Sequence, residues 1–326
     1  MNRMKPKISI AMTTYNGEKY LREQLDSYLE QSRQPDELVV CDDRSSDTTL
    51  TILEEFRDTA PFTVHVVRNE INIGFVRNFE NALSLCSGDI ICLSDQDDVW
   101  LPDKLATVER LFAENRQAMV LINDQEICDG NLTGFGTTKL GNILALGYSQ
   151  NCFMTGCCTS LRREWLSIVL PIPHAISSHD SWINRMAIAM QVRLLCEKPL
   201  QLYRRHECNA SNWIASSITS VSKVDAIRTH GLKSAMRGWK KEMETIDLCI
   251  ERIRQRAAAL ESMNLALPAR GAIKAFEKRK SALERRAQIV SRSPWRRPAA
   301  LVSFWLSGGY RNFAGWKSAL KDMVRP

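Results

Sequence analysis

The sequence predicts an α/β protein with a mixed, mostly parallel β-sheet, helices on both faces of the sheet, and a basic α-helical extension at its C-terminal end. Three observations support this fold class. Apolar strand patterns alternate with amphipathic helical patterns over about the first 120 residues. Acidic residues directly follow two of the apolar strands. The sign of the net charge changes near residue 220.

The first predicted strand covers residues 7–14, in which Ile8, Ile10 and Met12 alternate with small and polar residues. Asn16 is suited to cap the helix that follows. Further strands are predicted, in chain order, over residues 37–41, 62–67, 89–93 and 118–122. A pattern of apolar residues at helical spacing separates each strand from the next.

Residues 124–150 contain five glycines and are expected to form a loop. After this loop we expect a strand over residues 153–160, a helix from Ser181, and two separate strands over residues 192–196 and 200–206. From about residue 221 the pattern becomes helical and basic.

The charge is distributed unevenly. Residues 1–220 contain 21 Lys and Arg against 28 Asp and Glu, whereas residues 221–326 contain 23 against 9. A basic region of this kind is suited to an anionic partner, such as a lipid surface or a phosphorylated acceptor. No apolar run approaches the ~20 residues of a membrane-spanning helix, and no signal-peptide pattern is found. We therefore expect a cytoplasmic protein whose ten cysteines are reduced and mostly buried.

The strongest motif is the acidic segment that directly follows the predicted strand 89–93. It consists of Asp95, Gln96, Asp97 and Asp98. Carboxylates this close repel one another unless a cation offsets their charge. Hard oxygen ligands suit Mg²⁺ or Mn²⁺, whose remaining positions substrate phosphates can fill. The alternative is an acidic turn that caps the following helix.

Two further acidic positions have a functional and a structural interpretation. Asp42 and Asp43 end the strand 37–41, where a carboxylate can accept hydrogen bonds from a nucleobase or a ribose; the alternative is the N-terminus of a helix capped by Ser46 or Asp47. Asp180 precedes an apolar helix and is either a general base or an N-cap. A metal, a base and no protein nucleophile together predict a single displacement, in which a nucleoside diphosphate leaves a sugar and the configuration is inverted.

Four stretches, residues 9–21, 40–48, 72–89 and 93–105, occur in an order and spacing that resemble the family 2 inverting glycosyltransferases with the GT-A fold. The resemblance covers residues 7 to about 210. The segment DQDDVW, with the later HD and YRRH, is most similar to the bacterial branch described as rhamnosyltransferases of surface polysaccharide assembly. This resemblance implies a nucleotide-diphospho-sugar donor and favours L-rhamnose as the sugar. It also implies transfer to an acceptor hydroxyl in O-antigen or capsule assembly.

The resemblance also implies roles for single residues. Asp95 and Asp97 would hold Mn²⁺ or Mg²⁺ with the diphosphate, Asp97 being favoured as the direct ligand, and Asp180 would be the base. The donor-binding residues it implies are Thr13, Tyr15, Asp42, Asp43, Gln96, Arg204 and His206.

The domain boundaries follow the resemblance and the change of charge. We expect a catalytic domain over residues 1–215, with a donor half of about 1–123 and an acceptor half of about 124–215, and a basic helical region over 216–326. Aromatic and basic residues are interleaved at the C-terminal end. They favour docking on the inner face of the cell membrane, near a glycan or polyprenyl-diphosphate-linked acceptor, and the alternative is a helical bundle or an oligomer contact.

Other functions are compatible with parts of the sequence. A sugar-1-phosphate nucleotidyltransferase also uses an α/β sheet and a metal, but its glycine-rich loop is missing after the first strand. A catalytically inactive scaffold of a glycan-assembly complex would not need Asp95, Asp97 and Asp180. Nucleic acid is not expected as a partner, because only the basic C-terminal region would support it.

Overall fold

The computed structural model describes the chain except for residues 1–4, 208, 210–212, 223–234, 314 and 326. The chain divides into two compact units, Met1–Ala226 and Ile227–Pro326. The nine described cysteines form no disulfide, and seven of them are buried, as their apolar surroundings predict.

The first unit is built on a mixed sheet that has nine strands in the described residues, in the order β3-β2-β1-β4-β8-β6-β9-β5, with β7 paired to β6. The strands are β1 (Ile8–Thr14), β2 (Glu37–Asp42), β3 (Thr63–Arg68), β4 (Ile90–Ser94), β5 (Val99–Trp100), β6 (Val120–Cys128), β7 (Gly134–Thr138), β8 (Thr159–Arg162) and β9 (Arg193–Arg204). Strands β1 to β4 are parallel, and β8 joins β4 to β6 by antiparallel pairing. The carboxyl ends of β1, β2 and β4 therefore lie along one edge.

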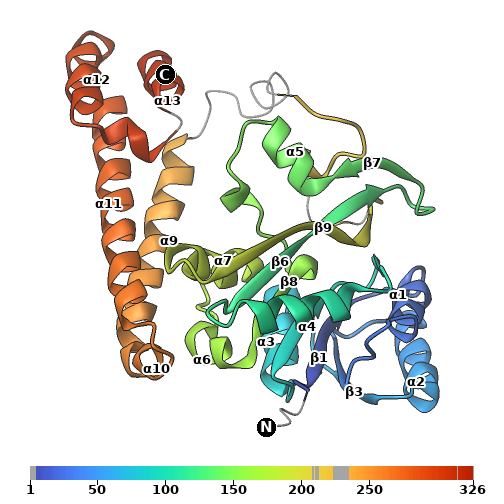
Figure 1. Cartoon of the computed structure of the whole chain (residues 1–326). Helices are drawn as coiled ribbons and strands as arrows, with labels where there is room; N and C mark the ends of the chain where they lie inside the picture. Colours follow the sequence, from blue (N-terminus) through green and yellow to red (C-terminus); the bar gives the residue numbers. More distant parts are fainter. Residues whose placement is uncertain (1–4, 208, 210–212, 223–234, 314, 326) are drawn as a thin grey trace. The chain divides into compact units, whose positions relative to one another are not determined.

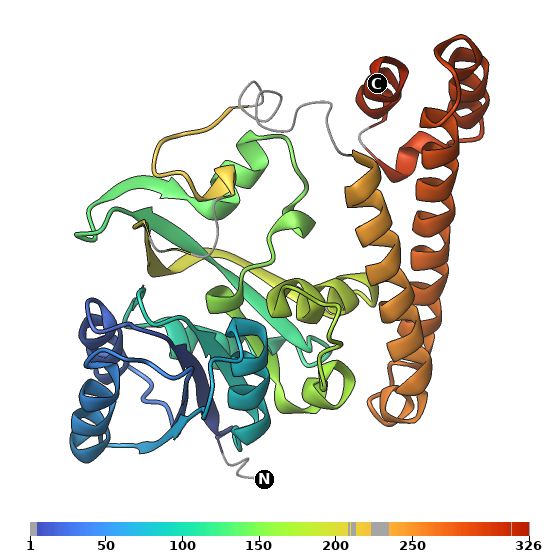
Figure 2. The same ribbon diagram turned by 180° about the vertical axis from the view of Figure 1, so that it is seen from behind.

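Helices cover both faces of this sheet, as the alternating pattern predicts (Figures 1 and 2). They are α1 (Leu21–Leu29), α2 (Thr49–Thr59), α3 (Phe75–Leu85), α4 (Lys104–Glu114), α5 (Lys139–Ala145), α6 (Leu166–Val169) and α7 (His179–Ala189). The apolar sides of α1, α2 and α4 share one core with Ile8, Ile10 and Met12 of β1. Helix α3 packs against β1 and β2, and α7 packs beside α3. The alternation along β1 thus separates two helical layers.

Three predictions about residues 124–206 are wrong. Residues 124–128 extend β6, and β7 and α5 follow, because the buried Asp124 carboxylate accepts the backbone N–H groups of Gln125 and Leu140 at 2.8 and 3.0 Å. Strand β8 is short because residues 150–152 and 156–158 form 3₁₀ turns. Strand β9 continues across Pro199 because register shifts in its pairing with β6 accommodate the proline.

The second unit is helical, as the sequence predicts. It contains α9 (Ala235–Gln255), α10 (Ala257–Ser262), α11 (Ala266–Val290), α12 (Arg297–Leu306) and α13 (Trp316–Val324). Helices α9 and α11 lie side by side in both views (Figures 1 and 2). The buried Asp322 of α13 accepts two hydrogen bonds from Arg286 of α11, at 2.7 and 2.8 Å, and one from the Tyr310 hydroxyl at 3.0 Å. Among the described residues, no helix combines the length and the apolar character needed to span a bilayer.

Candidate active site

The loop after β2 is held in place by the first of two neighbouring carboxylates. Asp42 is fully buried at the end of β2. Its Oδ1 accepts a hydrogen bond from the Thr14 hydroxyl at 2.9 Å, and its Oδ2 accepts the backbone N–H of Ser45 at 2.8 Å. Both oxygens are thus occupied inside the protein, so Asp42 supports the loop from beneath and offers no exposed atom to a ligand.

The second carboxylate, Asp43, orders the segment that leads into α3. Its Oδ1 accepts the backbone N–H of Ile73 and its Oδ2 that of Gly74, each at 2.8 Å. Asn69 donates a further hydrogen bond to Oδ1 at 2.9 Å. Thr13, at the end of β1, is half-buried, and Tyr15 is exposed. The structure therefore leaves Thr13 and Tyr15 more accessible to a ligand than Asp43.

Gln96 connects the loop after β1 to the loop after β4. Its side-chain carbonyl accepts the backbone N–H of Tyr15 at 2.8 Å, and its amide donates to the Tyr15 carbonyl at 3.1 Å. The absence of a side chain at Gly17 is required here, because a Cβ atom would lie 2.4 Å from the Gln96 Oε1 atom. Gln96 thus aligns the two loops along the edge of the sheet.

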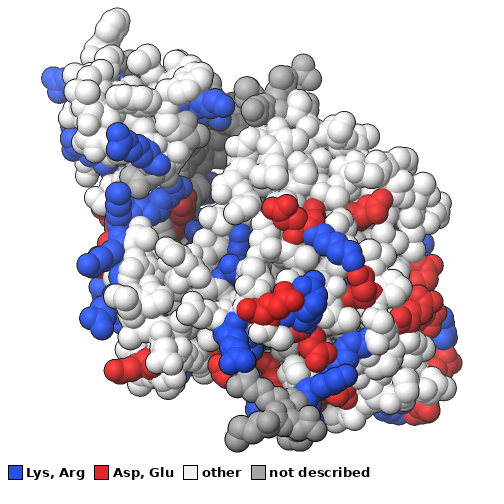
Figure 3. All heavy atoms as spheres, viewed as in Figure 1, with Lys and Arg blue, Asp and Glu red and all other residues white. Residues whose placement is uncertain are grey.

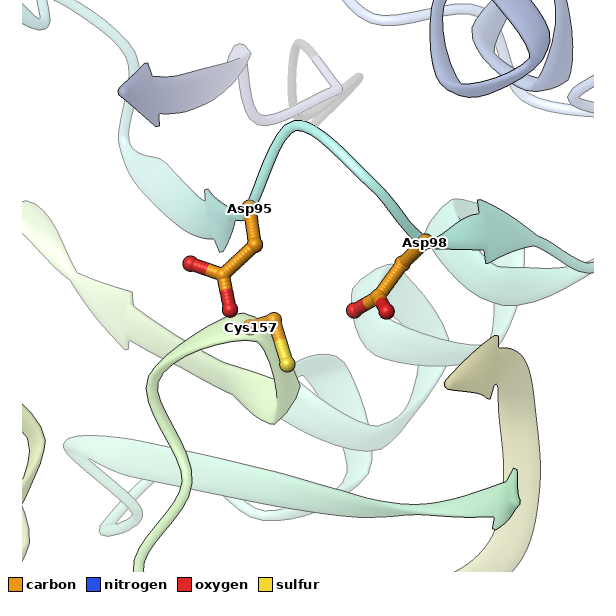
Figure 4. Close-up of side chains that lie close together, drawn as sticks. All are labelled: Asp95, Asp98 and Cys157. Carbon is orange, nitrogen blue, oxygen red and sulfur yellow. The ribbon is translucent and has the colours of Figure 1, made fainter. Parts of the chain in front are cut away.

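The three carboxylates of residues 95–98 have different environments. Asp98 is fully buried and accepts hydrogen bonds from the Gln201 amide at 2.9 Å and the Arg204 backbone N–H at 3.3 Å. Asp95 is half-buried and points towards the Cys157 thiol, and Asp98 lies on the other side of this thiol (Figure 4). Burial and, to a smaller extent, the negative charge of Asp97 raise the pKa of Asp95 to about 7. The same causes raise the pKa of Asp98 well above its usual value.

Asp97 points towards the end of β9. Its Oδ2 lies 2.7 Å from the His206 Nε2 atom and 3.3 Å from the Asn209 amide nitrogen. The neighbouring Arg204 is 2% exposed, and its guanidinium donates to the backbone carbonyls of Asp97 and Gly130 at 2.9 and 2.6 Å. Arg204 therefore fixes the chain beneath the site, whereas His206 and Asp97 line it.

Asp180 lies in the first turn of α7, where the helix dipole favours a negative charge. The residue that caps this helix is Ser178, whose hydroxyl accepts the Ser181 backbone N–H at 3.2 Å, and Asp180 Oδ1 accepts the same N–H at 2.6 Å. The turn at residues 156–158 connects the two carboxylates, because a Cβ atom at Gly156 would lie 3.8 Å from the Asp180 Cβ atom and the neighbouring Cys157 thiol lies within 4.8 Å of an Asp95 oxygen. Asp180 is thus a carboxylate in the first turn of α7 and not its N-cap, and its assignment as a general base stays a prediction.

Comparison with known proteins decides the family. Residues 9–169, which include β1 to β8 and the acidic segment, match the model of the family described as glycosyl transferase family 2. The chain belongs to glycosyltransferase family 2.

Individual relatives agree with this assignment. The glycosyltransferase is 29% identical over 217 residues to the dTDP-rhamnosyl transferase RfbG of Shigella flexneri, covering 61% of this chain and 72% of RfbG. It is 31% identical over 137 residues to the abequosyltransferase RfbV of Salmonella typhimurium, covering 41% and 39% of the two chains. The solved structure of S. aureus TarS 1-349 in complex with UDP superposes with a TM-score of 0.53 at 19% identity, over 86% of this chain and 91% of that one. The structural likeness shows the GT-A fold.

The described part of the glycosyltransferase contains one cluster of potential metal ligands, and its composition does not suit the expected metals. Among the described residues, Asp95, Asp98 and Cys157 have potential ligand atoms within 4.8 Å of one another. A thiol is a poor ligand for Mg²⁺ or Mn²⁺, and the pKa of the Cys157 thiol is well above its usual value. Asp97 and His206 are half-buried and lie 2.7 Å apart through Oδ2 and Nε2, and among the described residues they form no such cluster with Asp95. The carboxylate oxygens of Asp95 and Asp97 are nevertheless the type of ligand that Mg²⁺ and Mn²⁺ prefer.

The sequence did not identify the residues beneath the acidic segment. Lys104 is fully buried at the start of α4, and its Nζ atom donates to the Cys157 carbonyl at 3.1 Å and lies 3.8 Å from the centre of the Trp100 ring. Burial lowers its pKa, although the charge of Asp98 acts in the opposite direction. A lysine next to an aspartate-rich strand end is ordinary in a sequence, so only the fold shows that Lys104 faces inward.

Proposed function

We propose that this glycosyltransferase transfers a sugar, L-rhamnose, from a nucleotide-diphosphate donor to a hydroxyl of a bacterial surface glycan, in O-antigen or capsule assembly, with inversion. The observation that carries this proposal is the turn at residues 156–158, which lies beside Asp180 at Gly156 and beside Asp95 at Cys157. The similarity to RfbG supports rhamnose and a dTDP donor.

Different residues of the site would bind the metal, contact the donor and accept the proton. Asp97, together with Asp95, would hold Mn²⁺ or Mg²⁺, which supplies positive charge to offset the charge of the departing diphosphate, and His206, which pairs with Asp97, would contact the donor. Thr13 and Tyr15 would contact the nucleoside, and Gln96 would keep their loop in position. Asp180 would accept the proton of the acceptor hydroxyl as that oxygen attacks the sugar. With no protein nucleophile required, one displacement inverts the anomeric configuration.

The proposal also assigns a role to each region of the chain. Residues 1–215 would act as the catalytic domain, with the donor bound by residues 1–123 and the acceptor by residues 124–215. Residues 216–326 would keep the enzyme at the inner face of the cell membrane. The acceptor would then be a glycan carried on a polyprenyl diphosphate, because such a lipid presents its hydroxyl groups at that surface.

A donor-hydrolysis screen tests the reaction class. The purified protein is incubated with dTDP-, UDP- and GDP-sugars in the presence of Mn²⁺, Mg²⁺ or EDTA, and release of the nucleoside diphosphate is measured. We expect release from dTDP-rhamnose with a metal and none with EDTA. Failure of every activated sugar to be hydrolysed or bound would support the inactive scaffold instead.

Substitutions separate the two carboxylate roles. Asp97→Asn should remove metal-dependent turnover, whereas Asp180→Asn should retain donor binding and lose transfer by about 10²–10⁴-fold, the usual contribution of a general base. Asp103→Asn is the matched control, because Asp103 is an exposed aspartate shortly after the acidic segment and pairs with Lys198 at the surface. Donor binding is measured by calorimetry and transfer by product formation. Full transfer in Asp180→Asn would overturn the assignment of the base.

A further inference from the structure

The exposed side of α12 carries no charged residue. Arg297 is buried, and the residues that face outward are Pro298, Ala299, Val302, Ser303, Trp305 and Leu306. Val302 is 57% exposed and Leu306 80% exposed. A helix on the surface of a protein in water normally turns charged residues outward, so this side of α12 is suited to an apolar environment.

Helix α13 shows the reverse of the usual amphipathic pattern. Its inward side carries Ser318 and Asp322, and Asp322 is held by Arg286 and Tyr310. Its outward side carries Trp316, Leu320, Met323 and Val324, all about half-exposed or more, together with Lys317 and Lys321. A buried ion pair holds this helix in place while its large apolar residues face away from the core. Hydrophobic burial within the unit therefore does not explain the apolar residues of α13.

Basic residues surround these apolar residues. Residues 285–326 contain nine Lys and Arg and one acidic residue, Asp322, which is fully buried. Figure 3 shows the end of the second unit that carries α12 and α13 in white and blue, without red. Trp295, in the turn before α12, is 93% exposed beside Arg296. Exposed tryptophan next to arginine and lysine is the composition of a helix that lies in the interface of an anionic bilayer.

We propose that α12 and α13 form a surface that docks on an anionic lipid bilayer. The α12–α13 surface is defined by the exposed side chains of Val302, Trp305 and Leu306 of α12 and of Trp316, Leu320 and Met323 of α13, two helices that are in contact in the fold. The apolar side chains enter the boundary between headgroups and acyl chains, and Lys317 and Lys321 pair with lipid phosphates.

Charge favours lipid over the other occupants of such a surface. A second copy of this chain would bring two surfaces of the same positive sign together, with no exposed carboxylate in residues 285–326 to offset them. Nucleic acid would match the charge but would leave the six apolar side chains in water. An anionic bilayer matches both the positive charge and the apolar side chains.

Vesicle co-sedimentation of the full-length protein tests this proposal. We expect binding to vesicles of phosphatidylglycerol and phosphatidylcholine at low salt, and little binding to vesicles of phosphatidylcholine alone. The triple variant Trp305→Ser, Trp316→Ser, Leu320→Ser should lower the binding constant at least about tenfold. The double variant Lys317→Gln, Lys321→Gln should bind more weakly and with less dependence on salt.

Leu267→Ser is the matched control, because Leu267 is 77% exposed on α11 of the same unit and lies outside the α12–α13 surface. Circular dichroism and thermal unfolding show that each variant is folded. The proposal is overturned if the wild type binds neither vesicle, or if the triple variant binds as well as the wild type. Loss of an oligomer in the triple variant, without lipid binding by the wild type, would assign the surface to a second copy. No turnover is measured, so this result is independent of the proposed reaction.

Discussion

At the scale of single residues, position relative to the buried core gives similar carboxylates different properties. Asp95, Asp97 and Asp98 are adjacent in the sequence, yet Asp98 is enclosed with Gln201, Asp97 pairs with His206, and Asp95 remains between them. The acidic segment therefore holds both a supporting carboxylate and accessible ones. This division explains why concentrated charge at this strand end is tolerated: only part of it must be offset by a ligand.

The raised pKa of Asp95 gives a pH-dependent effect on stability. Because its pKa is about 7 in the folded protein against 3.8 ordinarily, the folded state binds more protons between these values, and this residue's contribution to the free energy of unfolding grows as pH falls from 8 to 5. Asp95→Asn should therefore stabilise the metal-free protein at pH 8, and its thermal unfolding midpoint should rise by about 2–4 °C for each kcal/mol added to the free energy of unfolding. The rise in the midpoint should be smaller at pH 5.

Thermal unfolding in EDTA at both pH values measures this difference, with Asp103→Asn as the control. Asp103 forms a surface pair with Lys198, so its variant should change the midpoint little at either pH. An equal gain for Asp95→Asn at pH 5 and pH 8 would show that the Asp95 carboxylate is not destabilised by its surroundings.

The candidate site was predictable where chemistry depends on residue type and strand position. Asp95, Asp97 and Asp180 could be singled out because carboxylates at the ends of buried strands and helices are conspicuous, and their roles stay predictions. The partners of Arg204 could not be identified, because Glu23 and Gly130 are remote in sequence. The sequence also did not show that the centre of the Arg204 guanidinium lies 4.4 Å from the centre of the Tyr20 ring.

At the scale of elements, the turn at residues 156–158 couples the acidic segment to α7. Cys157 faces Asp95 and Asp98, while Gly156 packs against the imidazole of His179. His179 is buried, stacks on Phe79 at 4.1 Å between ring centres, and has a pKa lowered by burial. The start of α7 is therefore positioned by packing on this turn, and Asp180 follows directly.

Gly156→Ala should disturb this contact. The new Cβ atom would lie 2.7 Å from the His179 Nε2 atom, so the ring or the turn must move, and Asp180 would move with it. We expect a decrease in transfer rate with donor binding retained, measured by single-turnover kinetics and calorimetry. Gly271→Ala in α11 is the control: a Cβ there meets nothing within 4 Å, and the helix should gain about 0.5–1 kcal/mol. Unchanged transfer in Gly156→Ala would show that this contact does not position the base.

The elements most accurately predicted are the strands at the centre of the sheet, which are buried on both faces. β1, β2 and β4 lie within a residue or two of their expected bounds, because their alternation or apolar runs reflect burial. The interval 124–150 was expected to be a loop because its glycines suggest turns, but Gly134 and Gly136 lie in β7. β7 is held by antiparallel pairing with the preceding strand β6, and the glycine content of the interval does not reveal this pairing.

At the scale of the whole molecule, the two compact units differ in composition and in expected ligands. The first contains the acidic site and the second the excess of positive charge. A ligand that binds only one unit stabilises only that unit unless the two unfold together. Scanning calorimetry with dTDP and Mn²⁺ should therefore raise the midpoint of one transition and leave a second unchanged. A single transition that shifts as a whole would show that the units unfold cooperatively.

The burial of Asp322 determines how the C-terminal end responds to its surroundings. Residues 285–326 contain no histidine and no other acidic side chain, and lysine and arginine keep their protons to about pH 10 and beyond. The charge that this end shows to solvent is therefore constant across the acidity range of a living cell. Its attraction to an anionic surface would be adjusted by lipid composition and ionic strength, and acidification would not release it.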